Sequence, residues 1–277
     1  VPEVARDCAV LNADDILCLK MAAYTDAKRI AYFTLNPKNR LVQEHIQAGG
    51  VAAVLEEGIR GQMITLYDEG RHLPLLWTHL VPATMEGKAL HNVQNAMVAA
   101  VSAYATGVSL DNIRQGLRTF DTSFFQVPGR MNVFDEHPFK VILDYAHNPA
   151  AVQCMVQFTN RLDVARNKLC VVSAPGDRRD EDVQEIARLV AHGNFDHVVV
   201  RRDDSTRGRG DDEIPQLLRQ GMIDAGMPEE RITVIIDEPE ALGYALNKAK
   251  PGDLLLVFGD AITRCWKQIV TFKPEQT

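Results

Sequence analysis

Several features that would assign this 277-residue sequence to a protein class are missing. Its formal net charge of −7 leaves no basic surplus, which argues against a role that depends on nucleic-acid phosphates. No apolar run approaches the roughly 20 residues that a membrane-spanning helix needs, and the N-terminus lacks a basic and then apolar signal segment. We therefore expect a cytoplasmic protein without a nucleic-acid or membrane partner.

Paired cysteines are also missing. The five cysteines, Cys8, Cys18, Cys154, Cys170 and Cys265, are scattered through apolar runs. No C-x-x-C pair and no Cys/His cluster has the spacing of a zinc site, so we expect no metal ligands of that kind. The sequence predicts buried, reduced thiols, with a nucleophilic cysteine as a distant alternative.

The short motifs of common nucleotide and hydrolase sites are absent as well. No G-x-x-x-x-G-K-[ST] phosphate loop occurs, because Gly87 and Lys88 are followed by Ala89 and lack the leading glycine. G-x-G-x-x-G after the first strand of either half, G-x-S-x-G and H-E-x-x-H do not occur either. The chain therefore offers no loop of its own to cradle phosphates.

What the sequence does contain is ample core material and a regular alternation of patterns. Hydrophobic residues make up 46% of the chain, and its length suits one large domain or two ordinary ones. In the first part, strand patterns occur at 8–12, 29–35, 51–55, 62–67 and 73–79, and helical patterns at 16–24, 37–49, 91–106 and 110–120. These runs predict alternating strands and helices with an inserted meander. The first strand fits either an ordinary edge strand or a piece that begins inside a domain.

The alternation becomes regular after the loop DTSFFQVPGR, where we place the domain boundary. Strand patterns at 131–136, 139–144, 168–174, 196–202, 231–236 and 253–259 alternate with helical patterns near 149–162, 180–192, 211–225, 238–249 and 260–270. Strand, crossover helix and strand in succession predict a doubly wound α/β sheet with helices on both faces.

The stretch Val127–Pro149 is the one around which the chain is organised. Its second strand ends at Asp144, and His147 and Asn148 follow just before a helical pattern. Asn148 suits an N-cap and Pro149 the first helical position. Since ligands bind at the carboxyl edge of open α/β sheets, three polar residues at such a strand end favour a site over a cap alone.

Three further strand ends are predicted at the same edge: 174–182, 201–210 and Gly259–Asp260. The candidate residues of the first are Asp177, Arg178, Arg179, Asp180 and Asp182. Arginines there suit phosphates or carboxylates, and the acids suit a cationic amino acid or Mg²⁺-bound water. Gly176 is expected to give the turn its freedom. A solvated charged loop is at least as good an interpretation of 201–210.

Asn92 and Asn95 stand three residues apart at the start of a predicted helix, so they share one face. Their amides can cap the helix or bind a heteroaromatic ring through paired hydrogen bonds. On the pattern alone, capping is the safer interpretation.

Taken in order, the motifs H-N-x-x-N-A (91–96), V-P-G-R (127–130) and D-Y-A-H-N-P (144–149) resemble those of the Mur ligase superfamily. The phrases VLNADD (10–15), VPGRMNVFD (127–135), APGDRRDED (174–182) and LLLVFGD (254–260) narrow the resemblance to its cyanophycin synthetase branch. This resemblance implies the later portion of a Mur ligase central ATPase domain over 1–126. A Rossmann-like, doubly wound Mur ligase C-terminal domain would follow over 127–277.

The resemblance also implies an ATP-dependent ligase that joins Arg to the Asp side chains of a poly-Asp backbone, using ATP and Mg²⁺. Asn95, and with it Asn92, would lie by the adenine, while Arg130, Asp144, His147 and Asn148 would close over the ribose and phosphates. The 176–182 turn would lie on the face of the C-terminal domain that receives the incoming amino acid. The resemblance suggests that the full-length enzyme is a homo-oligomer.

A complete member of this branch also carries an ATP-grasp module and a P-loop, which are not in this sequence. The chain alone is therefore expected to be inactive, with no catalytic residue of its own. Two alternatives stay open: a non-catalytic module that binds the polymer or a partner ligase, and a ligase of another Mur branch.

Overall fold

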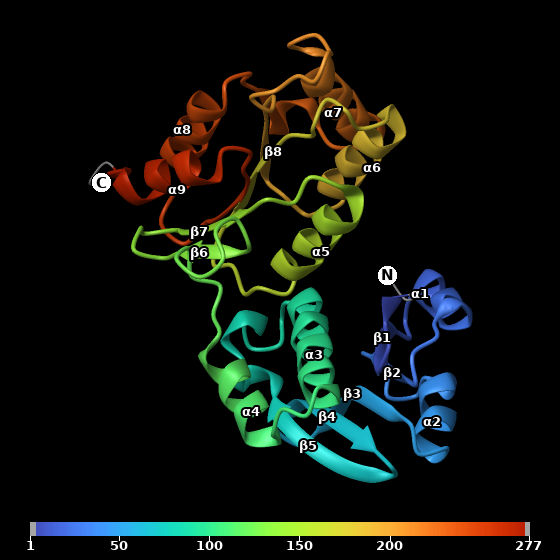
Figure 1. Ribbon diagram of the computed structural model, residues 1–277. Coiled ribbons are helices and arrows are strands. Elements are labelled where there is room, and N and C mark those ends of the chain that lie inside the picture. Colours follow the sequence, from blue (N-terminus) through green and yellow to red (C-terminus); the bar gives the residue numbers. More distant parts are fainter. Residues whose placement is uncertain (1–3, 275–277) are drawn as a thin grey trace. The chain divides into compact units, whose positions relative to one another are not determined.

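The computed structural model describes residues 4–274, and the chain divides into two compact units, Val1–Asp121 and Thr122–Thr277 (Figure 1). Both are α/β, as the alternating patterns predict. Within the described residues, no helix is both long and apolar enough to cross a membrane.

The first unit is built on a mixed five-stranded sheet in the order β1-β2-β3-β4-β5. Its strands are β1 (Cys8–Asn12), β2 (Arg29–Thr34), β3 (Val51–Gly58), β4 (Gly61–Asp68) and β5 (Arg71–Trp77). The first three are parallel, and β3, β4 and β5 form the antiparallel meander that the sequence predicts.

Helices pack on both faces of this sheet. They are α1 (Ile16–Met21), α2 (Arg40–Gln47), α3 (Leu90–Ala105) and α4 (Leu110–Thr119). The alanine-rich α3 lets its backbone approach the sheet closely, and its Val93, Met97 and Val101 join the main core with Ile64 and Leu66. A second, smaller cluster includes Val42 of α2.

The second unit holds a six-stranded sheet in the order β10-β9-β8-β11-β7-β6. Its strands are β6 (Asn132–Phe134), β7 (Lys140–Asp144), β8 (Lys168–Val172), β9 (His197–Val200), β10 (Ile232–Val234) and β11 (Leu254–Phe258). All pairings are parallel except that of the edge strand β6 with β7. The central strands are continuously buried, which explains why their sequences are unbroken apolar runs.

Five helices cover the two faces of this sheet (Figure 1). They are α5 (Pro149–Thr159), α6 (Asp180–Ala191), α7 (Glu213–Asp224), α8 (Glu238–Lys248) and α9 (Ile262–Thr271). Leu242 and Leu246 of α8 and Ile269 of α9 share one core with Val141 and Leu255 of the strands. Figure 1 shows α5, α6 and α7 on the opposite side. The doubly wound prediction is confirmed.

The cysteines correct one expectation. All five are free thiols, but only Cys170 and Cys265 are buried, while Cys8, Cys18 and Cys154 are half-buried. Burial raises the pKa of the Cys265 thiol to about 12, so this group stays protonated near neutral pH. Apolar neighbours in the sequence do not guarantee full burial, because positions on the rim of a core and at its centre have the same local sequence pattern.

Candidate functional site

The carboxyl ends of four parallel strands meet at one edge of the second unit's sheet. Phe258 of β11 is level with Asp144 of β7, and β8 and β9 run in the same direction. Ser173, Arg201 and Asp260 follow the ends of β8, β9 and β11. The expectation that these strand ends share an edge is therefore correct.

Asp144 lies buried at the end of β7, with 8% of its surface exposed. Its Oδ2 accepts a hydrogen bond of 2.8 Å from the backbone N–H of Met131. Burial raises the pKa of this carboxyl, because the charged form loses hydration that the hydrogen bonds only partly replace. Asp144 thus fixes the preceding loop against the strand end.

His147 and Arg130 lie near Asp144, and both contact Tyr145. Nδ1 of His147 lies 2.8 Å from the carbonyl oxygen of Tyr145. Since a carbonyl only accepts, Nδ1 donates in this contact, which leaves Nε2 for another partner. The exposed Arg130 guanidinium stands 5.9 Å from the centre of the Tyr145 ring. The structure therefore brings Arg130, Asp144 and His147 together.

Asn148 is the N-cap of α5, as predicted. Its Oδ1 accepts from the backbone N–H of Ala151 at 3.0 Å, and Pro149 occupies the first turn of the helix. The cap occupies the side-chain oxygen, so any contact that Asn148 makes with a ligand falls to its NH₂ group.

The sequence analysis missed Asn132, which holds the loop that carries Arg130. Asn132 is completely buried, and its Oδ1 accepts from the backbone N–H of Gly129 at 2.7 Å. Its Nδ2 donates to the carbonyl oxygens of Thr122 and Val127 at 2.8 and 3.0 Å. One amide thus saturates three backbone groups of the loop. An isolated asparagine beside an apolar run gives no local signal of this role.

The capping interpretation of Asn92 and Asn95 is wrong. Helix α3 begins at Leu90, and its N-cap, Ala89, makes no side-chain capping bond. Instead, Nδ2 of Asn92 donates to the carbonyl oxygen of Ala83 at 2.7 Å, and Nδ2 of Asn95 donates to Oδ1 of Asn92 at 3.1 Å. Asn92 therefore orients the exposed amide of Asn95 in the first unit. The other predicted residues belong to the second unit.

The two charged segments 174–182 and 201–210 form one interlocked structure. Arg209 joins them through four contacts. Its Nε donates to the carbonyl oxygen of Gly176 at 2.8 Å, and its Nη2 donates to that of Arg178 at 2.6 Å. Its Nη1 lies 2.7 Å from carboxylate oxygens of both Asp180 and Glu213. The interpretation of 201–210 as a merely solvated loop is therefore wrong.

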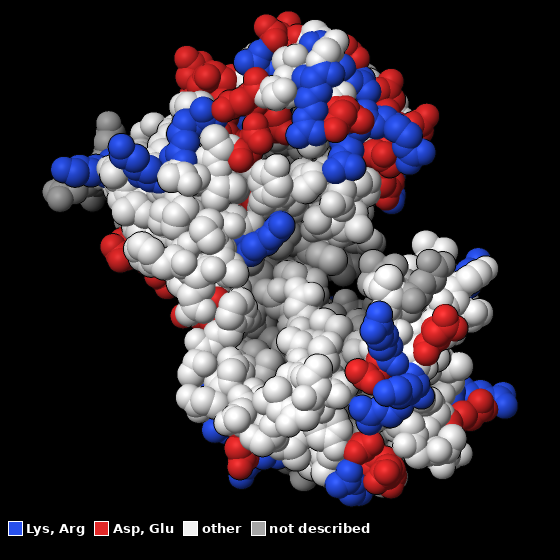
Figure 2. Space-filling model, in the orientation of Figure 1, with Lys and Arg blue, Asp and Glu red and all other residues white. Residues whose placement is uncertain are grey.

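Ion pairs reinforce this connection between the two segments. Asp177 is paired with Arg207, whose hydrogen bond, and then its charge, lowers the pKa of the Asp177 carboxyl below its ordinary value. Arg179 pairs with Asp182 at 2.9 Å within the first turn of α6. Figure 2 shows acidic and basic side chains crowded together where α6 and α7 lie. Arg179 and Asp182 of this turn thus pair with each other, while Asp177 and Asp180 pair with arginines of the 201–210 segment.

Gly176 also corrects an expectation. Its φ is not in the left-handed region, so the turn does not need conformational freedom there. A Cβ on Gly176 would instead stand 1.9 Å from the carbonyl oxygen of Thr206. The glycine is required by the close approach of another backbone segment.

A small pocket lies between these two segments, at the carboxyl edge. Its walls include Gly176, Arg202, Asp203, Ser205, Thr206 and Arg209, and it encloses about 190 Å³, part of it open to solvent. Much of this space is open to solvent, so the pocket is a shallow recess rather than an enclosed cavity.

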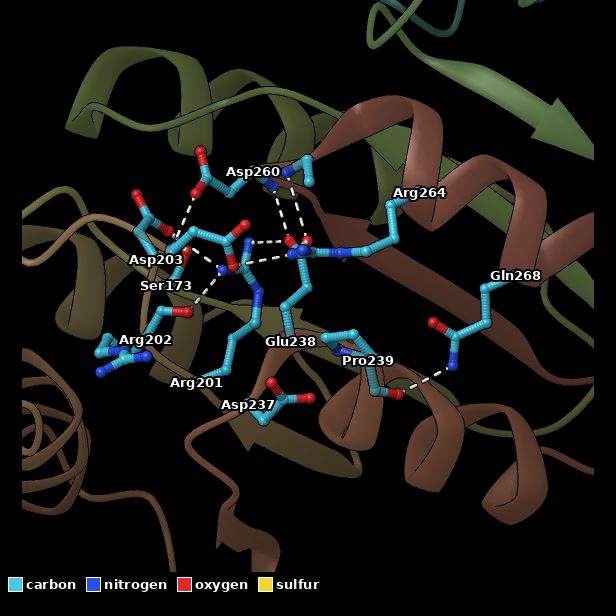
Figure 3. Close-up of polar contacts among 12 residues, drawn as sticks. Ser173, Arg201, Arg202, Asp203, Asp237, Glu238, Pro239, Asp260, Arg264 and Gln268 are labelled. Atoms are coloured by element: carbon cyan, nitrogen blue, oxygen red, sulfur yellow. Dashed lines mark hydrogen bonds and ion pairs between the residues drawn. The ribbon is translucent and has the colours of Figure 1, made fainter.

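A buried cluster of charged residues (Figure 3), which no sequence pattern indicates, lies behind the pocket and shares Asp203 with its wall. It is centred on Arg201 and Glu238, which are 1% and 2% exposed. Burial alone would raise the pKa of Glu238, but the charge of Arg201 and hydrogen bonds to the carboxylate outweigh it and lower the pKa. Burial is also the main influence on Asp203, whose pKa is raised.

Comparisons with known proteins agree with the motifs. Residues 129–261 match the family "Mur ligase, glutamate ligase domain". The chain is 38% identical to cyanophycin synthetase from Trichormus variabilis over 265 residues, which cover 94% of this chain and 28% of that protein. It is 26% identical to UDP-N-acetylmuramoyl-L-alanyl-D-glutamate–2,6-diaminopimelate ligase from Alkaliphilus metalliredigens, over 90% of this chain and 46% of that protein.

Among solved structures, the fold resembles that of UDP-N-acetylmuramoylalanyl-D-glutamyl-2,6-diaminopimelate–D-alanyl-D-alanyl ligase from Acinetobacter baumannii. The TM-score is 0.60 at 19% identity, and the match covers 96% of this chain and 51% of that one. The chain thus spans less than a third of the cyanophycin synthetase and about half of the structural neighbour. Residues 129–261 therefore belong to the Mur ligase, glutamate ligase domain family, and the chain as a whole is a relative of the cyanophycin synthetases.

Proposed function

We propose that this chain is part of an ATP-dependent acid–amino-acid ligase that joins Arg to the Asp side chains of a poly-Asp backbone. The observation that carries the proposal is the 38% identity to cyanophycin synthetases along 94% of the chain. The first unit is then the later portion of a Mur ligase central domain, and the second unit is the C-terminal domain. We place the boundary between these two domains between residues 126 and 127.

In such a ligase, ATP converts the side-chain carboxylate to an acyl phosphate. The neutral amine of the incoming amino acid attacks the acyl carbon and forms the C–N bond. Phosphate leaves with the electrons of the broken C–O bond, and the extra proton on the new amide nitrogen passes to water. Positioned cations must stabilise the negative charge that is spread over the phosphate oxygens, because catalysis of phosphoryl transfer depends mainly on positioning and electrostatic stabilisation. Mg²⁺ would supply part of that charge.

Each unit, taken by itself, presents residues that suit part of a nucleotide. The exposed amide of Asn95, oriented by Asn92, offers the paired donor and acceptor that an adenine edge requires. Arg130 is exposed and offers donors for a phosphate oxygen, and His147 offers Nε2 at the same turn. Asp144 would act by holding this turn, since its carboxylate already accepts from Met131. No G-x-x-x-x-G-K-[ST] loop is present to cradle the phosphate chain.

We propose that the chain needs further polypeptide of the natural protein, with P-loop and ATP-grasp parts, to turn over. The small part of the relative's length that the chain spans supports this. So does α1, which has no fully buried residue and leaves Ile16 and Leu17 66% and 63% exposed. Large apolar side chains left exposed side by side mark a surface that another segment can cover. The ligase would act as a homo-oligomer.

The test is a substrate-activation assay on the full natural protein. We expect phosphate release from ATP to require a poly-Asp acceptor together with Arg, and Arg to appear in the polymer by amino-acid analysis. Stimulation by diaminopimelate or glutamate instead of Arg would overturn the proposal in favour of another Mur branch. The lower identity of 26% to a diaminopimelate ligase makes that branch the weaker candidate.

A second assay tests the site assignment. The double variant Asp144→Ala/His147→Ala should lose ATP turnover while a Glu185→Ala variant, at a half-buried position on α6, keeps it. Normal turnover by the double variant would remove these two residues from the site. Full turnover by residues 1–277 alone would contradict the proposed inactivity of the chain. If the full natural protein bound the polymer but did not turn over ATP, a non-catalytic module would be favoured.

A further inference from the structure

The buried cluster behind the pocket contains an ion pair that links three strand ends. Nη2 of Arg201 lies 2.9 Å from Oε1 of Glu238, and both side chains are almost completely buried. Arg201 follows β9, and Glu238 is the first residue of α8 (Figure 3). Their partners come from the end of β11 and from the loop that lines the pocket.

The Arg201 guanidinium donates hydrogen bonds to two places, the loop after β9 and the end of β11. Its Nη2 donates to the carbonyl oxygen of Phe258 at 2.7 Å, at the end of β11. Its Nη1 donates to the carbonyl oxygen of Arg202 at 2.8 Å and to Oδ1 of Asp203 at 3.1 Å. A rigid, planar fork is suited to fixing several acceptors at once.

Glu238 completes the arrangement from the opposite side. It accepts hydrogen bonds from the backbone N–H groups of Asp260 and Ala261 at 2.8 and 3.2 Å, and from Nη2 of Arg264 at 2.5 Å. Arg264 also binds Asp204 at 2.8 Å, and Oδ2 of Asp260 accepts from the backbone N–H of Asp204 at 2.9 Å. Both ends of the link therefore return to the loop after β9.

That loop forms the wall of the pocket. Asp203 and Arg202 line it, and Asp203 also accepts a hydrogen bond from the hydroxyl of Ser173, after β8. The side-chain direction of Asp203 is thus set by Arg201 on one side and by Ser173 on the other. A change at Arg201 is expected to reach the pocket through Asp203 and Asp204.

Stability alone does not explain a charged pair at this place. Desolvating two ions costs much of what their attraction returns, so apolar residues of similar size often stabilise a fold equally well. What an apolar pair cannot do is hold the carbonyls of Arg202 and Phe258 and the amides of Asp260 and Ala261 in fixed directions. The contacts of this pair are directional and end on the pocket loop.

We propose that Arg201 and Glu238 are positioning residues, which fix the 202–204 segment so that the pocket beside Gly176 presents Asp203 to the incoming amino acid. This rests on the proposed ligase function only for the identity of the ligand. Neither residue lines the pocket, so both act through others.

The test compares three variants in the full natural protein. Arg201→Lys keeps the charge but loses the fork, and should raise KM for Arg about tenfold, as expected when one hydrogen bond to a charged group is lost. KM for ATP should stay unchanged. The double variant Arg201→Met/Glu238→Leu removes both buried charges, so neither is left unpaired. KM for Arg should stay raised, and the melting temperature should fall, because the backbone groups that the pair holds lose their partners. Arg188→Met, which breaks an exposed pair on α6, is the matched control.

Hydrogen–deuterium exchange supplies a readout that does not depend on activity. In the double variant, amides of 202–204 and 259–261 should exchange faster than in the parent protein, while the amides of β8 and β9 keep their protection. Wild-type KM for Arg with unchanged exchange in these segments would overturn the positioning role. If the parent protein shows no Arg-dependent turnover, the proposed function fails, and the exchange pattern by itself decides whether this pair positions the loop.

Discussion

Gly176 and Thr206 touch through their backbones. A Cβ added to Gly176 would lie 1.9 Å from the carbonyl oxygen of Thr206 and 2.7 Å from its carbonyl carbon. The obstacle is backbone, which cannot rotate away as a side chain can. Because Arg209 also binds the carbonyl oxygen of Gly176, the turn after β8 and the loop after β9 are held as one piece.

Gly176→Ala should separate the two segments. We expect a loss of about 1–3 kcal/mol in the free energy of unfolding, as for other overpacked sites, and weaker binding of the incoming amino acid. Urea unfolding of the chain measures the first, and KM in the full natural protein the second. Gly210→Ala is the control, since a Cβ there meets nothing within 4 Å. Equal behaviour of the two variants would contradict the contact.

Asn132→Ala should destabilise the second unit and release the loop that carries Arg130. The change leaves the backbone N–H of Gly129 and the carbonyls of Thr122 and Val127 without their partner. Each such group costs about 1 kcal/mol or more, so we expect a total near 3 kcal/mol in urea unfolding. The exposed Asn112→Ala on α4 should cost almost nothing. A similar loss for both variants would count against the role of Asn132.

Asp144→Asn should lower ATP turnover without lowering the free energy of unfolding. Burial raises the pKa of Asp144 in the folded state, so its contribution to stability is present below the ordinary value of 3.8 and is lost as the pH rises through the raised pKa. At pH 7 the neutral amide, which still accepts from Met131, should leave the free energy of unfolding equal or up to about 1 kcal/mol higher. ATP turnover of the full natural protein should fall, because the turn loses its charge beside Arg130.

The comparison for Asp144→Asn is Asp144→Ala, which removes the acceptor as well as the charge. Chemical unfolding at pH 7 should rank the alanine variant lowest. If the asparagine variant were as unstable as the alanine variant, the ionised carboxylate itself would be what holds the loop, and the assignment of a raised pKa would be wrong.

Glu56 should make the first unit sensitive to acid. Its carboxylate accepts from Tyr67 at 2.5 Å, from Thr65 at 2.7 Å and from His72 at 3.0 Å. Burial would raise the pKa of Glu56, but these hydrogen bonds outweigh it and lower the pKa below the ordinary 4.5. The stability that results is fully present above pH 4.5 and is lost as the pH falls through the lowered pKa.

The measurement is the free energy of unfolding between neutral and acid pH, for the parent chain and for Glu56→Gln. The parent should lose more stability below pH 4.5 than the glutamine variant does. Glu230→Gln, at an exposed position, should follow the parent curve. Parallel curves for all three proteins would show that Glu56 does not bind its proton differently in the folded chain.

Much of the fold could be predicted because its signals are local. The unbroken apolar runs of β8, β9 and β11 and the spacing within α3 follow from neighbouring residues, and observed and expected strands differ by a few residues at their ends. The cap at Asn148 and Pro149 is equally local, since the groups that satisfy one another lie within three residues. Parallel topology then places all the polar strand ends at one edge.

The rest of the candidate site could not be predicted, because its partners are distant in the chain. Arg201 continues a run of valines, and nothing nearby shows that its guanidinium is buried against Glu238 and Phe258. Asn92 looks like a cap until the carbonyl of Ala83 is found beside it.

The sequence by itself determined the order of helices and strands, the shared strand edge and the kinship with Mur ligases. Only the tertiary structure decided that Gly176 serves contact with Thr206 and that Arg209 joins two charged segments. It also decided that Arg201 and Glu238 form a buried pair. The physical reason is that periodicity reports which face of an element is apolar, whereas the partner of a buried charge or the backbone beside a glycine depends on how the strands are ordered in the sheet.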